Sequence, residues 1–107
     1  MVLKNVVSLS EFPEAKMGKV SLAAGEHLYA GMNCFLPGQE HKAHVHADQD
    51  KLYYVLSGSG EAQVGAETHA VGAGDLILAA AGVVHGLKNT GSEPLSVLVV
   101  FGPPPRK

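Results

Sequence analysis

Two histidines, His44 and His46, stand one residue apart within the stretch from Gly38 to Gly58. On an extended strand such a pair points to one face, so both imidazoles can reach the same ion. Imidazole binds zinc, copper, iron and nickel, and a third ligand leaves positions open for water or a substrate. His85 is a candidate for that third ligand. The spacing therefore predicts a metal site that also takes a small molecule.

The histidine pair also has a plainer interpretation. It lies in the polar run 41–50, HKAHVHADQD, and two exposed histidines in a surface loop would show the same spacing. Spacing alone does not separate the two interpretations. A second motif that ties His85 to the pair is needed to favour the metal site.

Length and composition favour one β-rich domain. The chain has 107 residues, the size of one domain, and 46% of them are hydrophobic, enough for one core. The 13 glycines and the absence of tryptophan suggest many turns rather than long helices. Eight Lys plus Arg oppose ten Asp plus Glu without a basic cluster, so nucleic acid is not expected as a partner.

The compartment is inferred from the cysteine count and from the apolar runs. Cys34 is the only cysteine, so no disulfide can form within the chain, which fits a reducing compartment. The N-terminal residues lack the apolar run of a signal peptide, and no apolar stretch is long enough to span a bilayer. We therefore expect a cytoplasmic protein without a membrane partner.

Extended segments separated by turn residues recur at short intervals, and no amphipathic helix lies between them. This pattern favours a β-barrel or jelly roll over βαβ units. The run 76–81 is apolar throughout, which is typical of a strand buried on both faces. The ranges expected to form strands are 2–9, 19–22, 28–36, 52–56, 60–64, 68–71, 76–81 and 95–101.

The segment 28–36 is apolar on both of its faces. Tyr29 and Phe35 occupy one face, and the alternate residues from Leu28 to Leu36 occupy the other. A strand of this kind needs a core on one side and a second sheet or subunit on the other. We therefore expect a homodimer.

Two glycine-bounded segments resemble the two motifs of the cupin superfamily. The first motif is a glycine, five residues, His-x-His, three or four residues, a glutamate, six residues and a glycine. The second is a glycine, five residues, a proline, one residue, a glycine, two residues, a histidine, three residues and an asparagine. The first is filled by Gly38, His44, His46 and Gly58, and the second by Gly74, Gly82, His85 and Asn89, with Ala80 in place of the proline.

The resemblance implies an all-β, double-stranded β-helix, or jelly-roll β-barrel, with residues 1–107 as a single cupin domain that is commonly dimeric. It also implies a divalent transition metal (Fe, Mn, Zn, Ni or Cu) held deep in one end of the barrel by His44, His46 and His85. The plainer interpretation of the histidine pair then becomes the minor one, because His85 occupies its place in the second motif.

The glutamate of the first motif has no counterpart here. Counting three residues on from His46 reaches Asp50, whereas counting six residues back from Gly58 reaches Lys51. The two residues cannot both point inward from a regular strand. The count back from Gly58 runs along a strand, so we favour Lys51 as the inward residue. Tyr53, two residues further along the strand, points to the same face as Lys51 and could line the cavity.

Three interpretations of the site follow. The three histidines bind metal without a carboxylate, as in some dioxygenases of this superfamily. Alternatively, Asp50 reaches the metal through an irregular strand start. In the third, metal is weak or absent and Lys51 holds an anionic molecule.

The expected function is that of a metal-dependent dioxygenase or isomerase acting on a small anionic or carbonyl compound. A non-catalytic ligand-binding or structural module is the alternative. Catalytic residues other than the metal ligands are not identified.

Overall fold

The computed structural model describes residues 1–104 of the chain. Its regular secondary structure is antiparallel strand, apart from one short 3-10 helix near the N-terminus. The elements are η1 (Val6–Leu9), β1 (Gly18–Ala24), β2 (Tyr29–Phe35), β3 (Glu40–His44), β4 (Asp50–Ser57), β5 (Ser59–Val64), β6 (Glu67–Gly72), β7 (Leu76–Ala79), β8 (His85–Lys88) and β9 (Leu95–Gly102).

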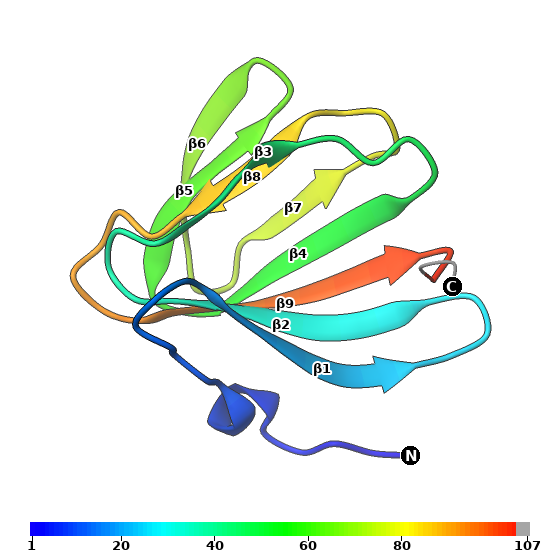
Figure 1. The fold of residues 1–107 in the computed structure, drawn as a ribbon, viewed down its shortest axis with the longest axis horizontal. Coiled ribbons are helices and arrows are strands. Elements are labelled where there is room, and N and C mark those ends of the chain that lie inside the picture. The colour runs from blue at the N-terminus through cyan, green and yellow to red at the C-terminus, as the bar shows by residue number, and fades with distance from the viewer. Residues whose placement is uncertain (105–107) are drawn as a thin grey trace.

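The strands form two sheets that face one another (Figure 1). The larger sheet has the order β1-β2-β9-β4-β7, and the smaller has the order β3-β8-β5-β6. Strands far apart in sequence are therefore neighbours, as in β2 beside β9 and β9 beside β4. This arrangement is the expected all-β double-stranded β-helix.

The core lies between the sheets and is built from alternate residues of the strands. On β4, Tyr53 and Val55 point inward, and their partners across β9 are Val99 and Val97. All four side chains are buried. The inward row of β4 begins at Lys51, so the apolar core gives way to polar groups at that end of the barrel.

Two residues of the glycine-bounded segments, Gly58 and Asn89, have structural roles. Gly58 has a φ of 87°, and a Cβ there would clash with the carbonyl oxygen of Pro94, so no other residue fits. Asn89 directly follows β8 and is a turn residue, because its side-chain Oδ1 accepts a hydrogen bond of 2.9 Å from the backbone N–H of Gly91. Its buried amide donates to the carbonyls of Phe35 and Glu93 at 2.9 and 2.8 Å, which ties the turn to β2.

Some strand predictions were wrong. The range 2–9 forms no strand, because Asn5 has a φ of 52° and the following residues turn into η1. Conversely, β3 and β8 were not predicted. They have five and four residues and contain histidine, lysine and glycine, so no β-branched or aromatic run marks them.

The range 76–81 is not a doubly buried strand. β7 ends at Ala79 and forms an edge of the larger sheet, where it pairs with β4 alone among the described strands. Ile77 and Ala79 face the core, whereas Leu76 and Leu78 are 61% and 57% exposed. The apolar run therefore has one face in the core and one open face.

The second apolar face of β2 is covered within the chain. Met32 and Cys34 are buried, and the N-terminal segment lies along this side of the sheet (Figure 1). The Ser10 hydroxyl lies 3.6 Å from the sulfur of Met32 and 2.8 Å from the hydroxyl of Ser96. This face of β2 is therefore covered by the N-terminal segment and not by the second sheet or subunit that was expected, while the dimer itself stays a prediction.

Among the described residues, no helix has the length and apolar character needed to cross a membrane.

Candidate metal centre

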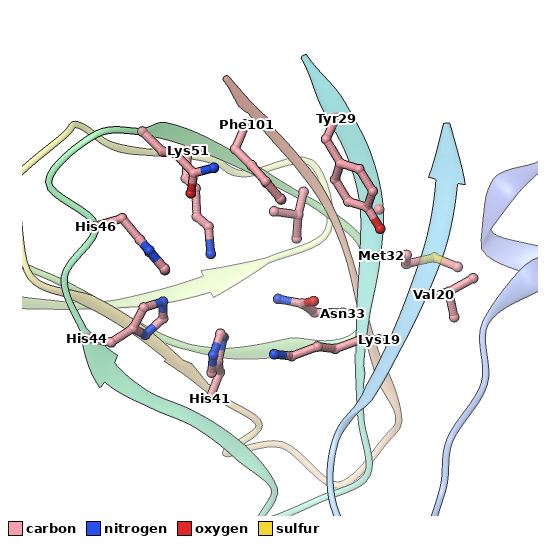
Figure 2. Close-up of a pocket in the computed structure, with 13 residues that line it drawn as sticks. Lys19, Val20, Tyr29, Met32, Asn33, His41, His44, His46, Lys51 and Phe101 are labelled. Atoms are coloured by element: carbon pink, nitrogen blue, oxygen red, sulfur yellow. The ribbon is translucent and has the colours of Figure 1, made fainter. Parts of the chain in front are cut away.

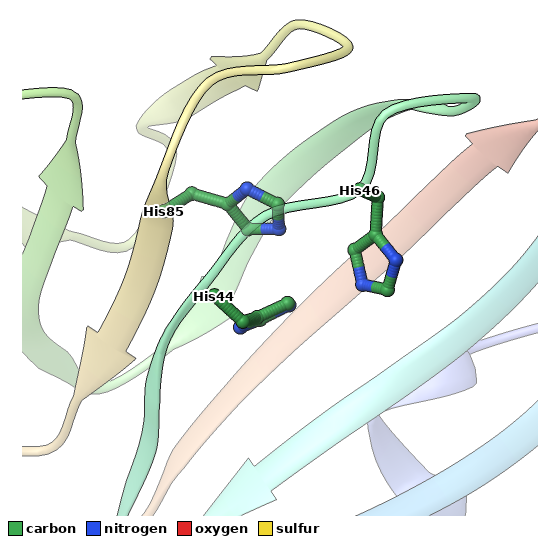
Figure 3. Close-up of side chains that lie close together, drawn as sticks. All are labelled: His44, His46 and His85. Atoms are coloured by element: carbon green, nitrogen blue, oxygen red, sulfur yellow. The ribbon is translucent and has the colours of Figure 1, made fainter.

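Three histidines, two from neighbouring strands and one from the loop after β3, meet at one end of the barrel (Figure 3). His44 ends β3 and pairs directly with His85, the first residue of β8, and His46 follows two residues later. One ring nitrogen from each lies within 4.8 Å of the others. The i, i+2 spacing places His44 and His46 on the same side, as predicted, and the β3–β8 pairing adds the third imidazole.

Two of the three rings have their tautomer set by the backbone. Nδ1 of His44 donates to the carbonyl of Lys42 at 2.8 Å, and Nδ1 of His85 donates to the carbonyl of Val83 at 2.9 Å. A carbonyl can only accept, so each neutral ring carries its lone pair on Nε2. Both Nε2 atoms are buried and have no hydrogen-bond partner among residues 1–104.

This donor set fits a transition metal. Metal-ligating histidines commonly donate their second nitrogen to a backbone carbonyl, which orients the ring and fixes the ligating nitrogen. Burial lowers the pKa of His46 and of His85, although the hydrogen bond to Val83 partly opposes this shift in His85. In His46 and His85 burial therefore favours the neutral imidazole, which is the form that binds metal.

His44 and His46 line a cavity of about 680 Å³, a volume within the range of small-molecule sites (Figure 2). His85 lies behind them and is not among the residues that line this cavity. Aromatic and aliphatic side chains form part of its wall, including Tyr29, Phe101 and Val99. Polar groups face the same space, and no aspartate or glutamate of the described chain is among them. These polar residues are Lys19, Asn33, His41, His44, His46, Gln49 and Lys51.

Lys51 takes the inward position that the motif gives to glutamate. It is 8% exposed, lines the cavity, and its ammonium lies 5.9 Å from the centre of the Tyr53 ring. Burial, and then the charge of Lys19, lower the pKa of Lys51. The structure thus confirms Lys51 as the inward residue, which was predicted by counting six residues back from Gly58.

Asp50 points away from the cavity. Its carboxylate accepts a hydrogen bond of 2.8 Å from the backbone N–H of Ala81, and the residue is exposed. Among the described residues it makes no ion pair with Lys51. The strand start is regular here, so Asp50 is not brought to the histidines by a bulge.

Tyr53 is a core residue. It is 1% exposed, belongs to the hydrophobic cluster and does not line the cavity. Its ring centre lies 6.1 Å from that of His85. The buried hydroxyl has no hydrogen-bond partner within the described part of the chain, and burial raises its pKa.

His41 belongs to the cavity, and the sequence did not single it out. Its ring centre lies 4.2 Å from that of His44. Residues three apart on a regular strand point to opposite faces, but the β3–β8 register shifts between these two histidines. Burial, and then the charge of His44, lower the pKa of His41 to about 4. A bulge in an unpredicted strand leaves no periodic signal, so spacing could not reveal it.

Comparison with known proteins gives the same fold. The structure of the TT1209 protein from Thermus thermophilus matches with a TM-score of 0.93 and 35% identity, over 98% of this chain and 100% of that one. A Klebsiella pneumoniae protein is described as having a double-stranded β-helix domain. Its structure matches with a TM-score of 0.88 and 26% identity, over 96% of this chain and 90% of that one.

One longer curated relative is named for what it binds. Auxin-binding protein 1 of Arabidopsis thaliana is 31% identical to this chain, and the match covers 95% of this chain and 61% of the length of that protein. This chain spans 52% and 61% of the lengths of the two curated relatives that it matches.

The family assignment follows from the model match. The cupin domain model covers residues 31–101, which include both glycine-bounded segments and all three histidines of the cluster. With the jelly-roll topology and the shared fold of the solved structures, this match shows that the chain belongs to the cupin family.

Proposed function

We propose that this cupin binds a divalent transition metal through His44, His46 and His85 and uses it to act on a small anionic or carbonyl compound. The observation that carries the proposal is the pair of buried Nε2 atoms on His44 and His85, which have no partner among the described residues. Leaving such atoms unsatisfied costs free energy, which a bound ion would offset.

The cavity supports an anionic or carbonyl ligand. When bound, a divalent metal supplies a Lewis acid or a redox centre at the open side of the three imidazoles. Lys51 adds a positive charge in a buried position, and Tyr29 and Phe101 provide flat apolar surface for the body of the ligand. The proposed reaction class is an oxygen-dependent cleavage or an isomerisation.

Non-catalytic binding of a small molecule is the second candidate. It is supported by the Arabidopsis thaliana relative, whose name describes it as auxin-binding. The two candidates share the metal and the cavity, and they differ in whether the ligand is changed.

The test begins with elemental analysis of protein purified without chelator or tag. We expect close to one equivalent of a transition metal, and loss of that metal in His85→Ala. The matched control is His69→Ala, because His69 is an exposed histidine outside the cluster. Metal retained after replacing all three cluster histidines would overturn the proposal.

Catalysis is then tested on protein loaded with iron(II). Oxygen uptake with a panel of small keto and hydroxy acids supports the dioxygenase class, and a changed product without oxygen uptake supports the isomerase class. Saturable binding with neither change supports the binding module.

We also propose a homodimer formed through the outer face of β4, β7 and β9. This face carries the exposed side chains of Leu52, Tyr54, Leu76 and Leu78, and its neighbours on β9 are Leu98 and Val100. The outward charge on these strands is that of Asp50 at the start of β4, and its carboxylate binds the N–H of Ala81. A largely apolar face complements a second copy of itself around a two-fold axis, whereas the solvated face of an antiparallel sheet is commonly polar.

A further inference from the structure

Two lysines and no carboxylate line the cavity among the described residues. Lys19 on β1 and Lys51 on β4 both face this space (Figure 2). Within residues 1–104, neither lysine forms an ion pair. A buried ammonium without a counter-ion is unfavourable, so the positive charge of this cavity is left for a ligand to neutralise.

The two lysines stand at different depths. Lys51 is 8% exposed and lies over the inner aromatic rings of Tyr53 and Phe101. Lys19 is exposed, because its strand β1 forms the open edge of the larger sheet. Figure 2 shows its ammonium pointing back over the cavity toward His41. Lys51 is therefore an inner cation and Lys19 a cation of the rim.

The backbones of Lys19 and Lys51 lie far apart, so the two lysines do not form a single binding position for one acidic group. Through the paired residues Asn33 on β2 and Val97 on β9, Lys19 lies three strands from Val55 on β4. That is about 14 Å across the sheet, and Lys51 lies about 13 Å further along β4. Each ammonium therefore approaches the cavity from a different wall.

The positions of the two side chains agree with this division. Figure 2 shows the side chain of Lys51 beside His46 and that of Lys19 reaching toward His41. The inner cation thus lies on the His46 side of the cavity and the rim cation on the His41 side. Asn33, 8% exposed, lies between them on the wall and offers its amide to the same space (Figure 2).

We infer that the ligand of this cavity is a small organic acid with two acidic groups, one held beside the histidines by Lys51 and the other held at the rim by Lys19. The inference rests on the proposed function for the place of the inner group. The rim position is a separate subsite, and it selects diacids over monoacids of the same length.

The test uses isothermal titration of zinc-loaded protein with the diacids from malonate to adipate, each compared with the monoacid of equal chain length. At one or more lengths we expect the diacid to bind about two- to fivefold more tightly than the monoacid, the ratio that an exposed charge pair typically gives. Equal affinity for diacid and monoacid at every length would overturn the inference.

Three variants assign the two positions. Lys19→Met should remove the preference for the diacid and leave monoacid affinity unchanged. Lys51→Met should weaken both acids and keep their ratio. Lys88→Met, an exposed lysine on β8 outside the cavity, should change neither. A ratio that survives Lys19→Met in protein with an unchanged melting temperature contradicts the rim subsite.

The same samples separate this inference from the proposed metal function. Zinc titration reports the histidine site, and the diacid preference is measured again in metal-free protein. Failure to bind zinc, with a preference that still depends on Lys19, would reject the metal function and keep the subsite. Normal zinc binding without any preference would reject the subsite alone.

Discussion

The ammonium group of Lys51 lies 5.4 Å from the ring centre of Phe101, the residue directly opposite it on β9. The contact is a cation–π interaction, and the ring centre of Tyr53 lies 5.9 Å from the same ammonium group. Burial, and then the charge of Lys19, lower the pKa of Lys51, because both disfavour its charged form. The residue therefore holds an unfavourable charge in a place that suits an anionic ligand.

We predict that Lys51→Met stabilises the fold while weakening anion binding. Methionine keeps the aliphatic stem and removes the buried charge, so we expect a gain of about 1 kcal/mol after the loss of the cation–π contacts. For a domain of this size that gain raises the melting temperature by about 5 °C. Calorimetry of the metal-free protein checks it. A lower melting temperature would mean that the two rings compensate the charge fully.

The β4 register could be predicted from the sequence because it is fixed by strong local signals. The run from Leu52 to Leu56 is rich in aromatic and β-branched residues, and Gly58 marks its end. A regular strand alternates faces, so counting back from Gly58 placed Lys51 inward. Counting forward from His46 failed, because that segment is a loop.

Other parts of the site could not be predicted for physical reasons. His41 reaches the cavity through a bulge in β3, and Lys19 reaches it because an edge strand leaves its inward face open. The burial of Met32 depends on the N-terminal segment, which has no strand pairing among the described residues. A bulge, or a contact with a segment distant in the sequence, produces no periodic pattern of residues from which it could be predicted.

The second prediction compares the two residues at the place of the missing glutamate. Lys51→Glu should tighten metal binding, because it removes an inward cation and supplies a carboxylate from the same position. Asp50→Ala should leave metal affinity unchanged, since its carboxylate binds the N–H of Ala81 instead. It should cost about 1 kcal/mol of stability through that lost hydrogen bond.

Competitive chelator titration measures both affinities, and urea unfolding measures the stability. Weaker metal binding in Asp50→Ala, with no gain in Lys51→Glu, would show that Asp50 reaches the metal when it is bound.

The third prediction concerns the pH dependence of the metal-free fold. Burial lowers the pKa of His41 to about 4, and it lowers the pKa values of His46 and His85. Histidine in an unfolded chain titrates near 6.5. Between about pH 6.5 and pH 4 the unfolded state binds more protons, so stability is lost as the pH falls through this window.

Urea unfolding in the presence of a chelator, at several pH values across the window, checks this loss. His41→Gln should reduce the slope because it removes one of the buried neutral imidazoles. His69→Gln serves as the control, since His69 is exposed and its partner Glu67 is a surface carboxylate. An unchanged slope in His41→Gln would show that His41 is solvated in the folded state.

The last prediction tests the proposed dimer with a substitution on β7, the strand of the apolar face whose leucines are most exposed. Leu78 is 57% exposed on the outer face of β7, beside Leu52 of β4. Leu78→Lys places a charge on the apolar face, and in a two-fold interface the same charge enters twice. We expect the wild-type protein to sediment as a dimer at micromolar concentration and the variant as a monomer with an unchanged circular dichroism spectrum. Val2→Lys is the matched control, because Val2 is 80% exposed in the N-terminal segment and lies outside this face. A wild-type monomer would reject the dimer, and a dimeric Leu78→Lys would place the interface on another surface.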